Sequence, residues 1–260
     1  MELQLKGEHV LITGGSRGIG LACAREFLRE QCRVTLVARD AARLEQARAS
    51  LPPGDVGIYA ADLAEASAAH TLVERVEQER GPVAILVNSA GAPRRTPAGE
   101  LQPGDWEGAL RSKFLPYINM ISPLVQRMGA RGKGSIVNVV GLGGKVPAAI
   151  SLPGGAANAA LMLATAGLAA AWGPKGVRIN AVNPALTRTE LLDDFLDAQA
   201  RASGSTPDAV LEEMSARLPL RRPAQPQEVA DAVVYLASPR ASYISGAILS
   251  VDGATAATVV

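Results

Sequence analysis

The chain has 260 residues, of which 48% are hydrophobic and 20% charged, a composition typical of a soluble globular domain. Its formal net charge of +1 gives no strong field that would hold the protein on phosphate backbones or anionic lipids. Nucleic-acid and membrane roles are therefore not expected, and a small neutral or organic substrate is favoured.

Two cysteines, Cys23 and Cys32, are too few for a disulfide framework and lack the spacing of metal ligands, so no metal site is expected. We expect Cys23 to be a small core residue on a helix. The opening "MELQLKGEHVLITGG" leads into a strand without the basic and apolar segments of a secretory signal. These features predict a cytoplasmic protein in a reducing environment.

Short β-branched runs alternate with longer helical patterns along the whole chain, which indicates repeated strand-helix-strand units. The strands are nearly continuous apolar runs, as expected when helices cover both faces of a parallel sheet. We predict one domain over residues 1–260, a Rossmann-like, doubly wound α/β fold of about seven parallel strands with helices on both faces. The expected strands are 9–14, 33–39, 55–63, 84–91, 134–140, 177–184 and 247–253.

Two later helices carry specific expectations. A helix is predicted from about Asp105 to Met128, with a kink at Pro116, which has no amide hydrogen to donate. The alanine-rich stretch 156–172 contains Asn158 and Thr165 and is too weakly hydrophobic for a convincing membrane span. We expect this stretch to be a helix that packs against another subunit.

Residues 185–225 form the one irregular zone, with two short, charged, amphipathic helices expected after a strand end. Ligands of open α/β sheets bind beyond the carboxyl ends of the strands, so this segment is placed to act as a lid over a substrate. A solvated surface excursion is an equally weighted alternative.

The stretch "TGGSRGIG" follows the first strand and opens the first helix, with glycines at 14, 18 and 20. Glycine allows a tight turn and a close approach of the backbone to a pyrophosphate, and the helix N-terminus attracts an anion. Together with the strand before it and the helix after it, the pattern predicts a dinucleotide site.

The spacing of these glycines resembles that of the short-chain dehydrogenases/reductases, and the resemblance continues over nearly the whole chain. "AADL" at 60–63, "NSAG" at 88–91, "VNPALTRT" at 182–189 and the segment 226–254 are similar to family motifs. Ala185 replaces the glycine of the family's Pro-Gly turn. The resemblance implies the following cofactor-binding residues: Gly14, Ser16, Arg17, Gly18, Ile19, Gly20, Arg39, Asp62, Leu63, Asn88, Ala90, Gly91, Pro184, Leu186 and Thr189.

Charge at the end of the second strand indicates which dinucleotide is bound. An NAD site generally has an acidic residue there, but this chain has Ala38 followed by Arg39. Arg17 adds a second guanidinium from the glycine turn, and two guanidinium groups suit a phosphate dianion. NADP(H) is therefore preferred over NAD(H), although Asp40 could pair with Arg39 and weaken the preference.

The resembled family transfers a proton through a tyrosine whose pKa is lowered by a lysine one helical turn later. A serine binds the substrate oxygen, and an asparagine supports a water chain. Counting from Trp106 puts Lys113 at the asparagine position. The end of the strand 134–140 puts Val140 and Gly141 at two serines, and further counting gives Gly154 for the tyrosine and Asn158 for the lysine.

All four usual residue types are thus absent from the expected catalytic positions. The chain has four tyrosines, and none has a lysine four residues after it: Tyr59, Tyr117, Tyr235 and Tyr243. Lysine and asparagine are exchanged between positions 113 and 158. Our hypothesis is that Lys113 supplies charge or a proton and that Asn158 contacts a ribose hydroxyl, with Gly141, Gly154 and Gly155 enlarging the pocket. A coincidental lysine in a degenerated site has equal weight.

Two functions follow from the resemblance. The first is an NADP(H)-dependent oxidoreductase that transfers hydride to an imine, an activated double bond or a carbonyl of a small organic substrate. The second is a catalytically inactive NADP(H)-binding regulator, or the inert partner of an active relative. The helices from 112 and from 155 correspond to those through which family members dimerise and often form tetramers, so a homo-oligomer is expected.

Overall fold

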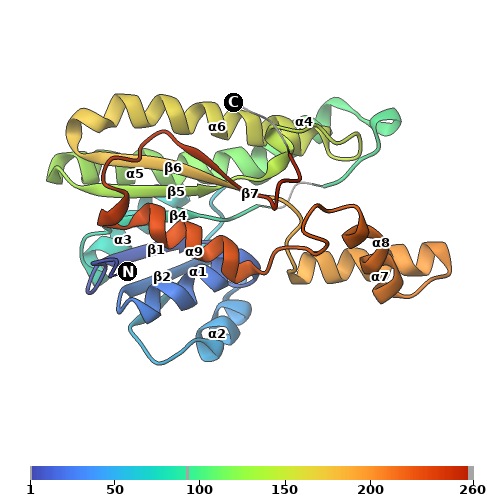
Figure 1. Cartoon of the computed structure of the whole chain (residues 1–260). Helices are drawn as coiled ribbons and strands as arrows, with labels where there is room; N and C mark the ends of the chain where they lie inside the picture. The colour runs from blue at the N-terminus through green and yellow to red at the C-terminus, as the bar shows by residue number, and fades with distance from the viewer. Residues whose placement is uncertain (1, 92–93, 257–260) are drawn as a thin grey trace.

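The computed structural model describes residues 2–91 and 94–256 and contains one seven-stranded parallel sheet in the order β3-β2-β1-β4-β5-β6-β7. From β1 the chain moves outward to β3, then crosses back to β4 and continues to β7 on the other side (Figure 1). The doubly wound sheet and the number of strands are as predicted. The strands are β1 (His9–Thr13), β2 (Arg33–Ala38), β3 (Val56–Ala60), β4 (Ile85–Asn88), β5 (Gly134–Val139), β6 (Val177–Pro184) and β7 (Ile248–Val251).

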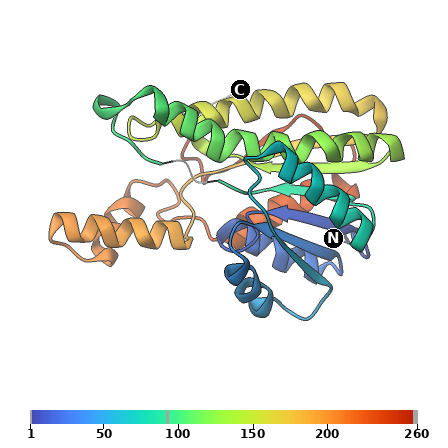
Figure 2. The same ribbon diagram turned by 180° about the vertical axis from the view of Figure 1, so that it is seen from behind.

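Helices cover both faces of the sheet, and each face has its own hydrophobic core (Figures 1 and 2). One face carries α1 (Gly18–Arg29), α2 (Ala41–Ser50) and α9 (Pro226–Ala237); the other carries α3 (Ala66–Arg80), α5 (Leu115–Arg131) and α6 (Leu152–Trp172). All residues of β1, β4 and β5 are buried, because side chains on both faces pack under helices. Cys23 is fully buried in α1, as predicted. Short 3-10 turns cover Ala98–Glu100, Leu142–Gly144, Gly173–Lys175 and Pro239–Ala241.

The helix predicted over 105–128 is interrupted one turn before Pro116. Helix α4 (Pro103–Ala109) runs into a π-helical turn (Leu110–Phe114), and α5 begins directly after it. In a regular α-helix the ring of Pro116 would clash with the carbonyl of Ser112, and the wider turn avoids this clash. The predicted kink at Pro116 is therefore corrected to a π turn that contains Lys113.

Helix α6 packs against β6 through one side and leaves much of its apolar surface exposed. By length and composition alone, Leu152–Lys175 could cross a membrane, with a mean hydropathy of 1.3 over an 18-residue window; helices of soluble proteins pass the same test, so the expectation that it is no convincing membrane span stays a prediction. Its buried Thr165 accepts a hydrogen bond from Asn138 on β5 and donates to Leu161 in the same helix. These bonds attach α6 to the sheet.

Helices α7 (Glu190–Ser203) and α8 (Pro207–Ala216) lie to one side of the two helical layers, as Figures 1 and 2 show. They are the two short helices predicted within residues 185–225. They pack mainly on each other through a small separate cluster formed by Leu192, Leu196, Ala200 and Val210. The pair thus has its own small core, connected to the sheet through the end of β6.

Candidate active site

A cavity of about 1120 Å³ lies beyond the carboxyl ends of β1, β2, β4, β5 and β6. The chain reverses its direction across the sheet between β1 and β4, and open α/β sheets bind ligands at such a point. Most residues predicted to bind cofactor line this one cavity, together with Lys113. They are Gly14, Ser16, Arg17, Gly18, Ile19, Arg39, Asp62, Leu63, Ala90, Gly91, Pro184 and Thr189.

Three predicted cofactor residues lie outside this lining. Gly20 packs so closely that an added Cβ would lie 2.4 Å from the Gly14 carbonyl oxygen, so its role is helix packing. Asn88 is buried and donates from Nδ2 to Asn138 Oδ1 at 3.0 Å, which joins β4 to β5. Leu186 lines a different cavity, described below. For these three a direct contact with the cofactor stays a prediction.

The turn between β1 and α1 fits a bound pyrophosphate. Gly14 has a φ of +65°, and a Cβ there would lie 2.7 Å from the Ser89 carbonyl oxygen. Gly18 has a φ of +55° and lies beside Thr189, at the start of α7. Arg17 is the N-cap residue of α1, and because a guanidinium has no acceptor, it leaves the first amides of the helix for an anion.

Three guanidinium groups line the cavity next to the ends of β1 and β2. Arg17 and Arg39 are the two predicted from the sequence, and Arg43, one helical turn after Arg39, joins them. Asp40 accepts from the Arg43 backbone nitrogen at 3.1 Å, and its carboxylate lies 3.5 Å from the Arg43 Nε. Asp40 thus caps α2 and pairs with Arg43 rather than with Arg39. Arg17 lies 3.8 Å from Glu190, a loose and exposed pair.

Lys113 also lines the cavity, beside the end of β5, and is 6% exposed. Its Nζ donates to the Tyr117 hydroxyl at 2.7 Å and to the Val139 carbonyl at 3.0 Å. Burial disfavours the ammonium form and lowers the pKa of Lys113 to about 7. The side chain can therefore carry or release a proton near neutral pH.

Tyr117 is a component of the site that the sequence analysis missed. It is fully buried, its hydroxyl donates to the Val139 carbonyl at 2.6 Å, and burial raises the pKa of the phenol. The search for a tyrosine considered only a lysine four residues later, whereas here the lysine comes four residues earlier. The same helical spacing read in both directions would have found the pair.

Gly141 and Gly155, two of the glycines predicted to enlarge the pocket, lie close to neighbouring segments, and the enlargement stays a prediction. A Cβ on Gly155 would lie 2.7 Å from the Gly143 carbonyl oxygen, because the turn Leu142–Gly144 packs directly on α6. Asn158 points at Gly141, where a Cβ would lie 3.1 Å from its Nδ2. Gly141, Gly154, Gly155 and Asn158 are all absent from the cavity lining. The Asn158 Oδ1 is buried and has no hydrogen-bond partner among the described residues.

Restoring a serine at position 141 is expected to destabilise the protein. Gly141 has a φ of +126°, which a side chain rarely adopts, and a Gly141→Ser variant should lose about 1–3 kcal/mol of unfolding free energy. Urea denaturation measures this loss. Gly143→Ser is the matched control, because that glycine has no positive φ and its nearest neighbour would lie 3.7 Å from the new Cβ. Equal stability of the two variants would contradict the strain at Gly141.

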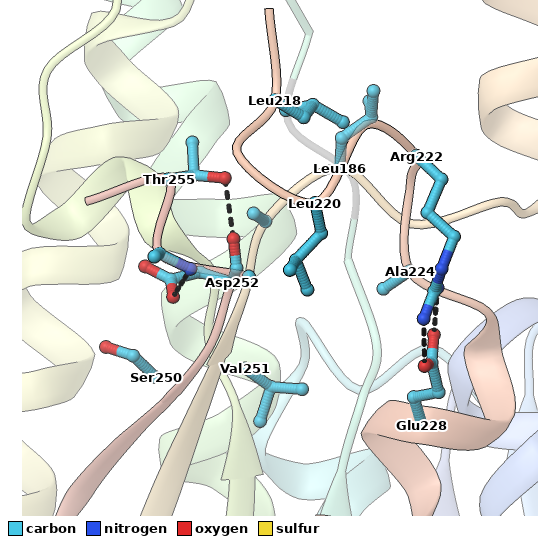
Figure 3. Close-up of a pocket in the computed structure, with 13 residues that line it drawn as sticks. Leu186, Leu218, Leu220, Arg222, Ala224, Glu228, Ser250, Val251, Asp252 and Thr255 are labelled. Carbon is cyan, nitrogen blue, oxygen red and sulfur yellow. Dashed lines mark hydrogen bonds and ion pairs between the residues drawn. The ribbon is translucent and has the colours of Figure 1, made fainter. Parts of the chain in front are cut away.

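A second cavity of about 330 Å³ lies on the other side of the segment that follows β6 (Figure 3). Its apolar wall includes Leu186 and Leu220. Arg222 makes two hydrogen bonds of 2.7 Å to Glu228, which hold the pKa of that carboxyl down at about 2. The Thr255 hydroxyl donates to the Asp252 carbonyl at 2.6 Å, as Figure 3 shows. These polar groups already bind one another, which makes this cavity a weak candidate for a charged ligand.

The family of the chain follows from comparison with known proteins. Residues 14–255 match the family model described as enoyl-(acyl carrier protein) reductase. D-threitol dehydrogenase of Mycolicibacterium smegmatis is 34% identical over 259 residues, which cover 97% of this chain and 94% of the relative. The L-tagatose-forming galactitol 2-dehydrogenase of Cereibacter sphaeroides is 33% identical over 252 residues, covering 96% and 95%.

A solved structure agrees with these relatives. L-sorbose reductase from Gluconobacter frateurii, complexed with NADPH and L-sorbose, matches the fold with a TM-score of 0.95 at 30% identity, and the match covers 100% of both chains. The chain belongs to the short-chain dehydrogenase/reductase family.

Proposed function

We propose that this protein is an NADP(H)-dependent oxidoreductase in which Lys113 exchanges the proton that a tyrosine exchanges in its relatives. The observation that carries the proposal is a single cavity that joins the glycine turn, three arginines and a buried lysine. The substrate is a small organic molecule with a carbonyl, an imine or an activated double bond.

The cavity suits a phosphorylated dinucleotide. The turn from Gly14 to Ile19 would hold the pyrophosphate, and Arg17, Arg39 and Arg43 would hold a 2′-phosphate. The Asp40 carboxylate pairs with Arg43 and not with Arg39, which leaves the Arg39 guanidinium for a phosphate. The cofactor, when bound, supplies or accepts a hydride. NADP(H) is therefore favoured over NAD(H).

The remaining cofactor contacts follow family positions that line the same cavity. Asp62 and Leu63 would contact the adenine, and Pro184 and Thr189 would hold the nicotinamide carboxamide. Lys113, Val139 and Val140 lie in the same wall of the cavity. This arrangement supports a reacting carbon close to Lys113.

Lys113 provides the proton in this proposal. Its ammonium group has three hydrogens, and two of them are donated to Tyr117 and Val139. The third is available to an oxygen or nitrogen of a substrate in the cavity. As the substrate carbon gains the hydride, the substrate oxygen or nitrogen takes the proton from Nζ. The neutral amine of Lys113 is then protonated again by solvent.

The relatives suggest which substrates to test first. Three of them are named for D-threitol, galactitol and L-sorbose. We therefore propose small polyols and the corresponding ketoses as test substrates. Imines and enones are added, because they do not require a tyrosine as the proton donor. Glu190 and Leu191, at the start of α7, line the cavity, which supports α7 and α8 as a lid over the substrate.

A homo-oligomer, either a dimer or a tetramer, is proposed from the exposed side of α4 and α6. Trp106, Leu110 and Leu163 expose 40%, 42% and 77% of their surface. Large apolar side chains along neighbouring helices are a common feature of subunit interfaces. Light scattering after size-exclusion chromatography measures the assembly, and a monomer at micromolar concentration would contradict this proposal.

The deciding experiment is calorimetric titration with NADPH and NADH, followed by a turnover screen. We expect tighter binding of NADPH, and oxidation of NADPH by at least one ketose, imine, enone or quinone. Tight binding without turnover would instead support a non-catalytic NADP(H)-binding protein. No heat with either dinucleotide would overturn the cofactor assignment.

A further inference from the structure

Three polar atoms beside the cavity are joined to one another by hydrogen bonds and form a triangle. Lys113 Nζ lies 2.7 Å from the Tyr117 hydroxyl and 3.0 Å from the Val139 carbonyl oxygen, and the hydroxyl lies 2.6 Å from that oxygen. The three residues come from the π turn, α5 and the end of β5. Each is at most 6% exposed, so water competes little with these bonds.

The direction of each bond in the triangle follows from the donors available. A phenol has one hydrogen, and Tyr117 donates it to Val139, so its oxygen accepts from Lys113. The Val139 carbonyl has two lone pairs and accepts both donors. Tyr117 has no exposed surface and is absent from the cavity lining. It cannot hand its proton to a substrate, and any influence on the reaction passes through Lys113.

We propose that Tyr117 is a positioning residue: with the Val139 carbonyl it accepts two of the three N–H groups of Lys113, so that the third N–H of Nζ points to the substrate. This inference rests on the proposed function, in which Lys113 exchanges the proton. It assigns a new task to a tyrosine that stands outside the family's catalytic positions.

The charges around Lys113 come from few groups. Tyr117 on α5 is the titratable group in contact with Nζ; β5 contributes a backbone carbonyl, and the loop after β4 contributes Gly91. Arg111, in the same π turn, is exposed and forms an ion pair with Glu65. Among the described residues no carboxylate pairs with Lys113, so burial is opposed only by the two acceptors.

Removing one acceptor should therefore lower the pKa of Lys113 further. Tyr117→Phe keeps the ring, whose centroid lies 4.6 Å from Nζ, and deletes only the hydroxyl. A hydrogen bond to a charged group has an energy that corresponds to roughly one unit of pKa or more. The matched control is Tyr59→Phe, because Tyr59 is also buried and its hydroxyl donates to Glu79 at 2.7 Å, away from the cavity.

The measurement is the pH dependence of acetylation of Lys113 by acetic anhydride between pH 5 and 10, quantified by peptide mass spectrometry. We expect the midpoint for Lys113 to fall by about one unit in Tyr117→Phe and to stay unchanged in Tyr59→Phe. With a turned-over substrate, the pH profile of kcat should move by the same amount. An unmoved midpoint in a folded Tyr117→Phe variant would overturn the proposal.

A second measurement covers the case in which Tyr117→Phe does not fold. Replacing all tyrosines biosynthetically by 3,5-difluorotyrosine makes the phenol a weaker acceptor, so the acetylation midpoint of Lys113 should again fall. A constant midpoint would also refute the inference. Acetylation needs no turnover, so a failure of the proposed oxidoreductase function would be seen separately, as a lack of activity in the unmodified protein.

Discussion

The Lys113→Met variant is expected to lower kcat for the reduction about 10²–10⁴-fold, the usual contribution of a positioned acid or base. Methionine is similar in length and fills the buried space without an amine. The arginines proposed to hold the 2′-phosphate lie beyond the ends of β1 and β2, whereas Lys113 contacts the end of β5, with β4 between them, so the Kd for NADPH should stay within about threefold. Steady-state kinetics and calorimetry measure the two effects separately.

The pH dependence gives this prediction a sign. Reduction needs the ammonium form of Lys113, whose pKa is about 7, so the rate of the unmodified protein should fall as the pH rises through 7. Oxidation needs the neutral amine and should show the opposite trend. Both trends should be lost in Lys113→Met.

Lys145→Met is the control for this variant. Lys145 lies in the loop after Gly141, and its Nζ lies 3.4 Å from the Ser250 hydroxyl, outside the cavity lining. Its removal should leave kcat and the pH profile unchanged. If Lys113→Met also retained full turnover and NADPH affinity, Lys113 would have no part in the reaction.

The Arg39→Ala variant is expected to raise the Kd for NADPH by about 10–100-fold and the Kd for NADH by less than about threefold. A charge-assisted hydrogen bond from a guanidinium to a phosphate is strong, and the variant would lose it with NADPH. NADH has no 2′-phosphate, so its affinity does not depend on this bond. Arg43→Ala should have a smaller effect in the same direction, because Arg43 already interacts with Asp40. Calorimetric titration of both dinucleotides measures the ratio.

Arg48→Ala is the matched control for charge. Arg48 lies on the same helix, α2, and pairs with Glu45 at 2.6 Å, away from the cavity. Its loss should change both affinities little. An equal loss of affinity for NADPH and NADH in Arg39→Ala would contradict a contact with the 2′-phosphate.

Features that depend on nearby residues could be predicted from the sequence. The continuous apolar strands required two covered faces, and that requirement determined the parallel sheet and its seven strands. The glycine turn is equally local, since glycine, without a Cβ, readily adopts the positive φ that Gly14 and Gly18 have. Most of the predicted cofactor residues therefore line one cavity.

The site around Lys113 required the tertiary structure. The four-residue spacing already places Lys113 near Tyr117, but only the packing of the π turn and α5 against the sheet brings both side chains to the carbonyl at the end of β5. The sequence identified the absence of the usual tyrosine but could not say what fills the space. At the neighbouring Gly155, the turn Leu142–Gly144 packs directly on α6, because residues without side chains allow two segments to approach closely.

The sequence by itself thus determined the seven-stranded fold, and it predicted the glycine turn and the two arginines that line one cavity, since each depends on local pattern. The replacement of the family's catalytic residue types stays a prediction. The tertiary structure alone decided that the Lys113–Tyr117 pair is buried at the end of β5, that Arg43 joins Arg17 and Arg39 in one cavity, and that the turn Leu142–Gly144 packs on α6. These three features depend on contacts between separate segments, and burial at such contacts gives Lys113 a pKa of about 7.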